Sequence, residues 1–238
     1  MTQCVKAICL KAVDYLDNDK MLLLFGAENG KFSARIRGVR KAEAKLKFCA
    51  QPFCFGEYEV TEKGGRYIVT NCTEIESFSS VSRDVDAYYS ACAMTEFCSA
   101  VLQENQPNVE LFIQLALALK YLTEKQPKLV LIKFLLEGLK SSGFGLTFDK
   151  CDSCGSETFS SLSLNLTDGG VACNDCIGTG AVYQLTASEV SCLNMIDQTP
   201  YERLNVLKFE NRYNGMLAAL SAYVEHLIKR INSLNFLF

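Results

Sequence analysis

Residues 151–176 read CDSCGSETFSSLSLNLTDGGVACNDC, in which two Cys-x-x-Cys pairs are separated by eighteen residues. This spacing lies within the range in which two such pairs fold together and offer four thiolates to one tetrahedral metal ion. Two residues between cysteines permit a tight turn that points both sulfurs at a zinc ion about 2.3 Å away. The sequence therefore predicts a structural zinc ribbon whose ligands are Cys151, Cys154, Cys173 and Cys176.

The residues between the two pairs fit a β-ribbon. Gly155 follows the first pair, where the turn often needs a positive φ, and Gly169 and Gly170 stand where a hairpin needs a tight return. An apolar patch that can pack the ribbon on its neighbour is supplied by Phe159, Leu162, Leu164 and Leu166. We expect the ribbon to be part of a larger body, because strongly helical segments lie directly before and after it.

Four other readings of these cysteines compete with structural zinc. A redox dithiol needs only one Cys-x-x-Cys, usually in a thioredoxin-like βαβ context, which the sequence lacks. A zinc deaminase needs His-x-Glu ahead of Pro-Cys-x-x-Cys, whereas the single histidine, His226, follows both pairs. Catalytic zinc keeps an open coordination position, which four cysteines close. Iron, or a site without metal, stays open as an alternative because four thiolates also suit iron.

Composition bounds the class of protein. The 238 residues suffice for one large or two small domains, and the change of pattern along the chain favours two. A chain with 49% apolar and 21% charged residues is globular rather than disordered. Residues 2–10 are interrupted by Gln3 and Lys6 and do not read as a secretory signal. The apolar runs around 115–119 and 129–136 are broken by Lys120 and Lys133 before they reach membrane length. We expect a cytoplasmic protein that needs no membrane.

The remaining cysteines show no paired spacing. In a cytoplasmic protein thiols stay reduced by default, and an isolated cysteine behaves as a small hydrophobic residue. We expect core or half-buried positions, without a reactive role, for Cys4, Cys9, Cys49, Cys54, Cys72, Cys92, Cys98 and Cys192.

Positive charge is concentrated near the beginning of the chain. The formal net charge is −3, but residues 1–80 carry 12 Lys and Arg against 10 Asp and Glu, and residues 81–238 carry 12 against 17. Within residues 31–47 the single acid is Glu43, and the basic side chains are Lys31, Arg35, Arg37, Arg40, Lys41, Lys45 and Lys47. Such a cluster on an acidic protein indicates a polyanionic partner.

The first 75 residues read as five short strands. We expect strands at 5–13, 21–25, 31–38, 48–60 and 66–75, with a basic loop or short helix at 38–47. Residues 31–37 alternate so that cations fall on one face and Phe32, Ala34 and Ile36 on the other. Five strands predict an OB-fold barrel, which binds single-stranded nucleic acid with cations and stacking aromatics. The aromatic candidates, which could equally be core residues, are Phe53, Phe55, Tyr58 and Tyr67.

Helical periodicity follows. Ser82 or Asp84 can cap a helix that ends near Leu102, Pro107-Asn108 opens a second helix, and a third runs from Pro127 to about residue 141. After the ribbon, Thr186-Ala-Ser-Glu189 is a capping-box signature, and beyond Pro200 an apolar stripe from 216 to 231 predicts a last long helix. The fold class is therefore α+β multidomain: an OB barrel at 1–80 and a helical domain at 81–238, interrupted by the zinc ribbon at about 148–183.

The order of these features resembles the bacterial RecO family of DNA repair and recombination mediators. The motifs that carry the resemblance are Gly38-Val39-Arg40-Lys41, Gln51-Pro52-Phe53, the helix end Leu139-Lys-Ser-Ser-Gly143, Cys151-x-x-Cys154-Gly155, and Gly169-Gly170-Val171-x-Cys173-x-x-Cys176. Each motif alone is unspecific, but together they span nearly the whole chain in order. The chain departs from the family pattern at Ala42-Glu43-Ala44, which replaces a more basic, serine-containing stretch.

The resemblance implies a non-enzymatic, nucleoid-associated protein. Such a protein binds single- and double-stranded DNA, anneals complementary strands, works with RecR to load RecA on DNA coated with single-strand-binding protein (SSB), and engages the acidic C-terminal tail of SSB. Carried over by position, the DNA-binding candidates are Lys31, Arg35, Arg37, Arg40 and Lys41, with Lys45 and Lys47 weaker. Four to seven phosphate contacts would give a log–log salt slope of about −3 to −5 on single strands.

Three rival functions stay open at this level. A metal-dependent nucleic-acid enzyme would need clustered carboxylates, an open metal position or a Gly-rich phosphate loop, none of which the sequence contains as a motif. An RNA-binding OB module would use the same cations and aromatics. A pure interaction scaffold would bind protein through its helices and nothing through its barrel.

Overall fold

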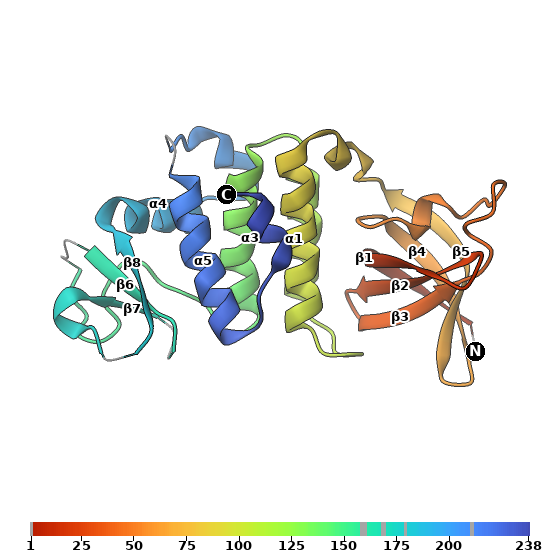
Figure 1. Ribbon diagram of the computed structural model, residues 1–238, viewed down its shortest axis with the longest axis horizontal. Helices are drawn as coiled ribbons and strands as arrows, with labels where there is room; N and C mark the ends of the chain where they lie inside the picture. The colour runs from red at the N-terminus through yellow and green to blue at the C-terminus, as the bar shows by residue number, and fades with distance from the viewer. Residues whose placement is uncertain (1, 158–160, 168–169, 179, 210–211) are drawn as a thin grey trace.

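The computed structural model describes residues 2–157, 161–167, 170–178, 180–209 and 212–238. They form three parts in a row, with a β-barrel at one end, a bundle of helices in the middle and a small sheet that carries the paired cysteines at the other end (Figure 1). None of the helices within these ranges is long and apolar enough to cross a membrane.

The N-terminal part is a closed five-stranded barrel. Its strands are β1 (Thr2–Tyr15), β2 (Asp19–Gly26), β3 (Gly30–Ile36), β4 (Phe55–Lys63) and β5 (Arg66–Glu76), in the order β1-β2-β3-β5-β4. The short parallel pairing of β3 with β5 closes the barrel, and all other pairs are antiparallel. In β3 the side chains of Phe32, Ala34 and Ile36 are buried while those between them are not, as the alternation predicts. The predicted OB-type barrel is confirmed.

One predicted strand begins later than expected. Residues 48–60 were predicted to be extended throughout, but Phe48–Ala50 form a single 3-10 turn and β4 starts only at Phe55. Pro52 has no N–H for a ladder, and Phe53 adopts φ 70°, which no strand residue adopts. The chain nevertheless stays against β1, because Phe53 N donates to Cys9 O at 2.8 Å and Cys9 N donates to Cys54 O at 2.9 Å.

Three helices form the centre of the molecule, and their caps are those that the sequence predicts. Helix α1 (Val85–Val101) begins at Asp84, whose carboxylate accepts from the N–H of Ala87, and α2 (Val109–Tyr121) begins at Asn108 in the same way. Helix α3 (Pro127–Ser141) has proline in its first turn, and Gly143 beyond its end has φ 84°. Nearly every large apolar side chain of α3 is fully buried, so this helix is the centre of the helical core.

The cysteine ribbon interrupts the helical part, as predicted. Strands β6 (Ser161–Asn165), β7 (Val171–Cys173) and β8 (Val182–Thr186) form a sheet in the order β7-β6-β8. Helix α4 (Ala187–Gln198) follows directly and has the predicted capping box between Thr186 and Glu189. Helix α5 (Tyr213–Leu227) packs against α3 and against β8, so the sheet is joined to the bundle. Two residues named in the ribbon prediction, Phe159 and Gly169, lie outside the described ranges.

The last helix is shorter than its apolar stripe suggested. Helix α5 ends at Leu227, and Ile231 stands instead before a 3-10 turn at Asn232–Phe236. The carboxylate of Glu96 in α1 accepts hydrogen bonds from the backbone N–H groups of Asn232 and Ser233 at 3.1 and 3.0 Å. Although burial alone would raise the pKa of Glu96, these donors hold it below its usual value. A tertiary contact therefore fixes the segment where sequence periodicity would continue the helix.

Two hydrophobic cores hold these parts together. One fills the barrel and includes Leu24, Phe32 and Tyr58. The other runs through the helices and the ribbon and also takes in Phe25 from the outside of the barrel. The rings of Phe25 and Phe55 meet Phe112 of α2 edge to face, at centroid distances of 5.4 and 5.7 Å. The barrel is thus fixed to the helical body by a continuous apolar contact.

Candidate nucleic-acid groove and metal centre

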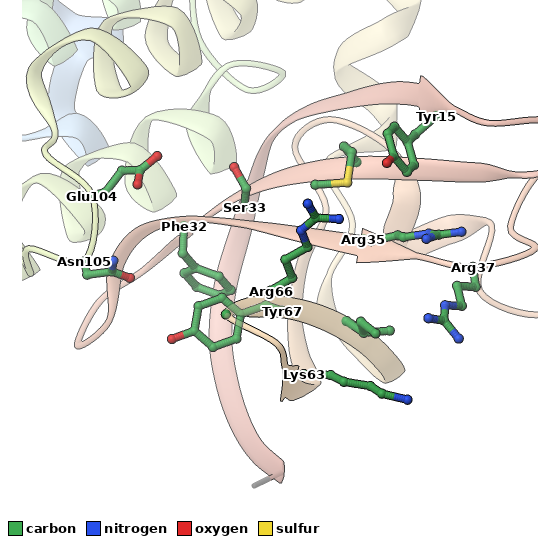
Figure 2. Close-up of a pocket in the computed structure, with 13 residues that line it drawn as sticks. Tyr15, Phe32, Ser33, Arg35, Arg37, Lys63, Arg66, Tyr67, Glu104 and Asn105 are labelled. Carbon is green, nitrogen blue, oxygen red and sulfur yellow. The ribbon is translucent and has the colours of Figure 1, made fainter.

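A groove of about 520 Å³ lies on the barrel surface beside the helical part (Figure 2). Strand β3 forms its floor, the β4–β5 hairpin forms one wall, Tyr15 marks one end, and Glu104 and Asn105 from the α1–α2 loop mark the other. Its cationic lining side chains are Arg35, Arg37, Lys63 and Arg66, and its aromatic ones are Tyr15, Phe32 and Tyr67.

Aromatic rings are fixed within this groove. Phe32 and Tyr67 pack edge to face with centroids 5.4 Å apart, and Tyr67 is only half-buried. At the other end the guanidinium of Arg35 lies 5.3 Å from the centre of the Tyr15 ring. Rings that stay partly exposed beside cations suit the stacking of bases above a tracked phosphate backbone.

Arg35 is paired with an acid. Its Nε donates to Asp19 Oδ2 at 2.6 Å, and its Nη2 makes an ion pair with the same oxygen. Asp19 also accepts from Gly38 N at 2.8 Å. The hydrogen bond from Gly38 N has the largest effect on the pKa of Asp19, and the hydrogen bond and charge of Arg35 add to it. Together they hold this pKa below its usual value, so the carboxyl is ionised at neutral pH. The charge of Arg35 is therefore largely offset, whereas Arg37 is exposed beside it.

The other basic residues of the 31–47 cluster are dispersed. Lys31 points to the helical part, where its Nζ donates to Ser99 O at 2.7 Å. Arg40 makes an ion pair with Asp14 at 3.2 Å, and Lys47 donates to Ala42 O at 2.7 Å. Lys41 and Lys45 are exposed on the loop that follows β3. Of the seven predicted DNA-binding residues, the structure brings Arg35 and Arg37 together in the groove and places Lys31, Arg40, Lys41, Lys45 and Lys47 outside it.

Sequence reasoning missed Lys63 and Arg66. They flank Gly64 and Gly65, which take φ values of 59° and 71° in the β4–β5 turn and so bring both cations over β3. The signal was available as a Lys-Gly-Gly-Arg turn between two strands, but nothing local indicated that this hairpin faces the basic strand. Of the aromatic candidates, Tyr67 lies in the groove, whereas Phe53 and Tyr58 are buried.

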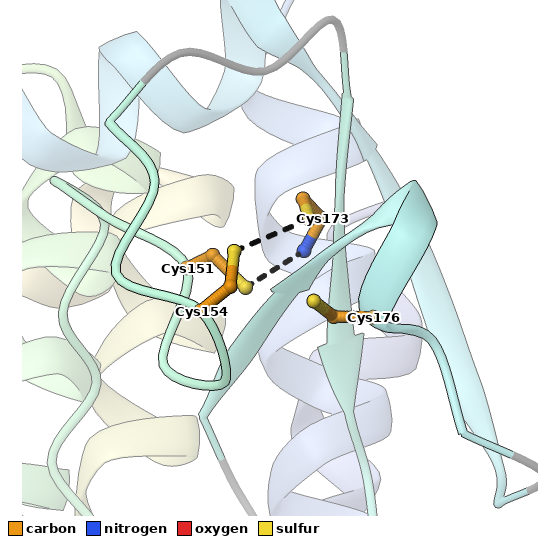
Figure 3. Close-up of side chains that lie close together, drawn as sticks. All are labelled: Cys151, Cys154, Cys173 and Cys176. Atoms are coloured by element: carbon orange, nitrogen blue, oxygen red, sulfur yellow. Dashed lines mark hydrogen bonds between the residues drawn. The ribbon is translucent and has the colours of Figure 1, made fainter.

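The four predicted cysteines meet at one point (Figure 3). The sulfur atoms of Cys151, Cys154, Cys173 and Cys176 all lie within 4.8 Å of one another. A tetrahedron with metal–sulfur bonds of about 2.3 Å has sulfur–sulfur edges of about 3.8 Å, and Cys154 Sγ lies 3.8 Å from Cys173 Sγ. Gly155 has the positive φ, 71°, that the turn requires. The donor set therefore fits a tetrahedral metal ion.

The electrostatics of the cluster also fit a cation. Hydrogen bonds from backbone N–H groups lower the pKa of the Cys151 thiol to about 6, and the largest effect comes from the N–H of Cys173, whose nitrogen lies 3.3 Å from Cys151 Sγ. Hydrogen bonds with Cys154 and then Cys173 raise the pKa of Cys176 to about 12. Four adjacent thiolates repel one another, so a bound metal ion is needed to keep all four deprotonated.

Most other cysteines are buried, as predicted. Burial raises the pKa of the Cys9 and Cys98 thiols, which makes them weak nucleophiles. Cys92 is half-buried, and Cys4 differs from the prediction because it is exposed on the first strand.

Comparisons with known proteins agree with the fold. The family model described as "Recombination protein O N terminal" matches residues 1–78, and "Recombination protein O C terminal" matches residues 82–234. Among the relatives, "DNA repair protein RecO" of Clostridium novyi is 29% identical over 87% of this chain and 81% of its own length. The protein of that name from Clostridium perfringens is 26% identical over 91% of this chain and 89% of its own.

The barrel, the helical body, the four-cysteine ribbon and these matches together define the class as DNA repair proteins. The chain belongs to the RecO family.

Proposed function

We propose that this chain is a recombination mediator that binds single- and double-stranded DNA through the barrel and anneals complementary strands. With RecR, it helps to load RecA on single-stranded DNA coated with SSB. In this proposal the protein carries out no catalysis. The unit that binds DNA is the barrel at 1–80, and the unit at 81–238 carries the zinc ribbon at about 148–183 and engages the C-terminal tail of SSB. The protein acts in the cytoplasm at the nucleoid.

The observation that carries the proposal is the groove. Three of its cations, Arg37, Lys63 and Arg66, have no carboxylate within ion-pair distance among the described residues, and two of its aromatic rings are partly exposed. Cations attract the phosphates of a strand, and aromatic faces stack on bases of any identity. Such a lining supports binding of a single strand with little dependence on its sequence.

Charge compensation provides the mechanism of annealing. Two complementary strands repel each other through their phosphates before they pair. The groove cations neutralise part of one strand, while Lys41 and Lys45 on the neighbouring loop lie outside the groove and can attract the other. Repulsion falls and pairing itself supplies the specificity, so the protein needs no base-specific contacts.

Zinc is the proposed metal of the four-cysteine site. Bound there, it would supply a closed tetrahedral crosslink and no open position for chemistry. The four cysteines would hold it at one end of the sheet, because Cys151 and Cys154 precede the start of β6 and Cys173 and Cys176 lie at and just beyond the end of the antiparallel β7. Its role would be to tie the ribbon to the helical body, since β6 and β8 pack on α4 and α5.

An annealing assay with purified protein tests the proposal. A variant with Arg37, Lys63 and Arg66 changed to alanine is compared with one in which three exposed cations of the helical part, Lys120, Arg203 and Lys208, are changed. We expect the first variant to lose annealing and single-strand binding and the second to keep both. Equal activity of the two variants would contradict the groove as the binding site.

The same preparations separate the rival functions. Cleavage of labelled DNA in the presence of magnesium would indicate an enzyme, and a clear preference for RNA over DNA of equal length would indicate an RNA-binding module. Loading is tested by the rate of RecA filament formation on SSB-coated DNA with and without RecR. We expect acceleration only when this chain and RecR are both present.

A further inference from the structure

An apolar hairpin tip stands at one end of the groove. Strands β1 and β2 stay paired as far as Tyr15 and Asp19, so only three residues form the turn. Leu16, the first of them, is 63% exposed, and Tyr15, which also lines the groove, is 37% exposed. Apolar side chains are not needed on a solvated turn, and exposed apolar groups beside a charged site often mark a contact surface.

The backbone of this tip is strained. Leu16 has φ 52°, in the left-handed region that bulky residues avoid. Asparagine or glycine would take this conformation more easily and would suit a solvated turn better. A strained backbone that holds a large apolar side chain in water contributes nothing to stability, and such positions often serve a contact.

The tip is also held rigidly, chiefly by one residue. Arg40 N donates to Asn18 O at 3.0 Å, while its Nη1 donates to Leu16 O at 3.3 Å and to Asp17 O at 3.2 Å. Its Nη2 pairs with Asp14 at the base of the hairpin. Arg40 therefore acts as a positioning residue that satisfies every carbonyl of the turn.

The surroundings of the tip determine what it can meet. Tyr15 and Arg35 share a cation–π contact, so the apolar surface continues directly from the charged end of the groove. The tip presents Tyr15 and Leu16 to solvent, and on nucleic acid such apolar side chains are buried against base faces; stacking on a face that is already free avoids the cost of separating stacked base steps. Bases inside a duplex are already stacked, whereas the terminal pair of a duplex presents a free face.

We propose that Tyr15 and Leu16 form a wedge that stacks on the last base pair where a single strand in the groove enters a duplex. The ligand is a single-strand/duplex DNA junction, with the overhang in the groove and the duplex beyond the tip. This inference rests on the proposed function, because it takes the groove to hold one strand. The junction is also the growing end of an annealed product, so the wedge would keep the protein at the place where pairing advances.

The test compares three fluorescent DNA ligands by anisotropy: a single strand, a blunt duplex, and a duplex with a single-strand overhang of the same length as the single strand. A base stacked on an aromatic side chain tightens binding by about tenfold or more, so we expect the wild type to bind the overhang ligand about tenfold more tightly than the single strand. Leu16→Asn, which suits the left-handed backbone, is expected to abolish this preference while changing single-strand affinity less than about twofold.

Two further variants control the test. Leu16→Met keeps an apolar side chain and is expected to retain the preference, as is Val85→Asn, which removes an equally exposed apolar residue from α1. The melting temperature of Leu16→Asn should equal or exceed that of the wild type. 2-Aminopurine placed at the terminal pair should change its fluorescence on binding of the wild type and not of Leu16→Asn.

The outcomes separate the two proposals. Failure of the wild type to bind single strands would overturn the groove itself. Single-strand binding without a preference for the overhang ligand, or the same preference in Leu16→Asn as in the wild type, would overturn the wedge and leave the groove intact.

Discussion

The pairing of Arg35 with Asp19 allows a quantitative prediction about the groove. The perturbation is Asp19→Asn, which keeps an oxygen that can accept from Gly38 N but removes the negative charge that offsets Arg35. The opposite perturbation is Arg37→Ala, which removes an exposed cation from the same strand end. The two changes should shift DNA binding in opposite directions without altering the shape of the barrel.

The magnitude follows from the number of uncompensated cations. Arg37, Lys63 and Arg66 contribute three phosphate contacts, and roughly 0.7 per contact on a single strand gives a log–log salt slope of about −2 for the wild type. Releasing Arg35 adds a fourth contact and steepens the slope to about −2.8, whereas Arg37→Ala reduces it to about −1.4. Four to seven phosphate contacts from the basic cluster at 31–47 predicted a slope of about −3 to −5, so the structure predicts a weaker dependence on salt.

The assay is fluorescence anisotropy with a labelled homopolymeric single strand, titrated at several salt concentrations between about 50 and about 200 mM. Over this fourfold range we expect the wild type to lose about 20-fold in affinity, Asp19→Asn about 50-fold and Arg37→Ala about sevenfold. Lys208→Ala, a change at an exposed cation of the helical part, is the control and should keep the wild-type slope.

The reasoning would be refuted by a particular pattern. If Asp19→Asn left the slope unchanged while Arg37→Ala flattened it, the Arg35 charge would not be available to DNA even without its acid. If neither variant changed the slope, strands would not run along this groove.

Three further predictions concern stability. Cys154→Ser should lose bound metal, measured by elemental analysis, and lower the melting temperature, because a structural metal contributes folding energy directly. Gly30→Ala should lower the free energy of unfolding by about 1 to 3 kcal/mol in denaturant titrations, because Gly30 has φ 69° and a Cβ there would lie 2.3 Å from Gln106 O across the barrel–helix contact. Acid should reduce the difference in melting temperature between wild type and Asp19→Asn. The pKa of Asp19 is lower in the folded state than in the unfolded state, where it is about 4, so the ionised carboxylate stabilises the fold above about pH 4. This contribution is lost as the pH falls through the folded-state pKa.

Each stability prediction has its own control. Gly64→Ala has a similar positive φ of 59° but no atom within 4 Å of the added Cβ, so it should cost less than Gly30→Ala. If the two substitutions lowered the free energy of unfolding equally, the close contact between Gly30 and Gln106 would not explain the effect of Gly30→Ala. A Cys154→Ser variant with the wild-type melting temperature would show that the ribbon does not depend on metal. A difference between wild type and Asp19→Asn that stays constant down to about pH 3 would contradict the role of the Asp19 charge.

Local patterns in the sequence were sufficient for much of the fold. Strand alternation in residues 31–36, the caps at Asp84 and Asn108 and the capping box at Thr186 depend on neighbours within a few positions, and all appear in the structure. The two Cys-x-x-Cys pairs belong to the same kind of signal, because each turn is local and a single hairpin suffices to bring the pairs together.

The sequence by itself therefore determined the order of the barrel, helices and ribbon and the four cysteines that meet in one cluster. Only the tertiary structure decided which cations remain available: Asp19 offsets Arg35, Ser99 engages Lys31, and Lys63 and Arg66 join the groove from another hairpin. The physical reason is the distance along the chain over which each feature is decided. Secondary structure and cysteine turns follow from short-range geometry, whereas the net charge of a surface depends on which distant strands and loops the fold places within a few ångströms of one another.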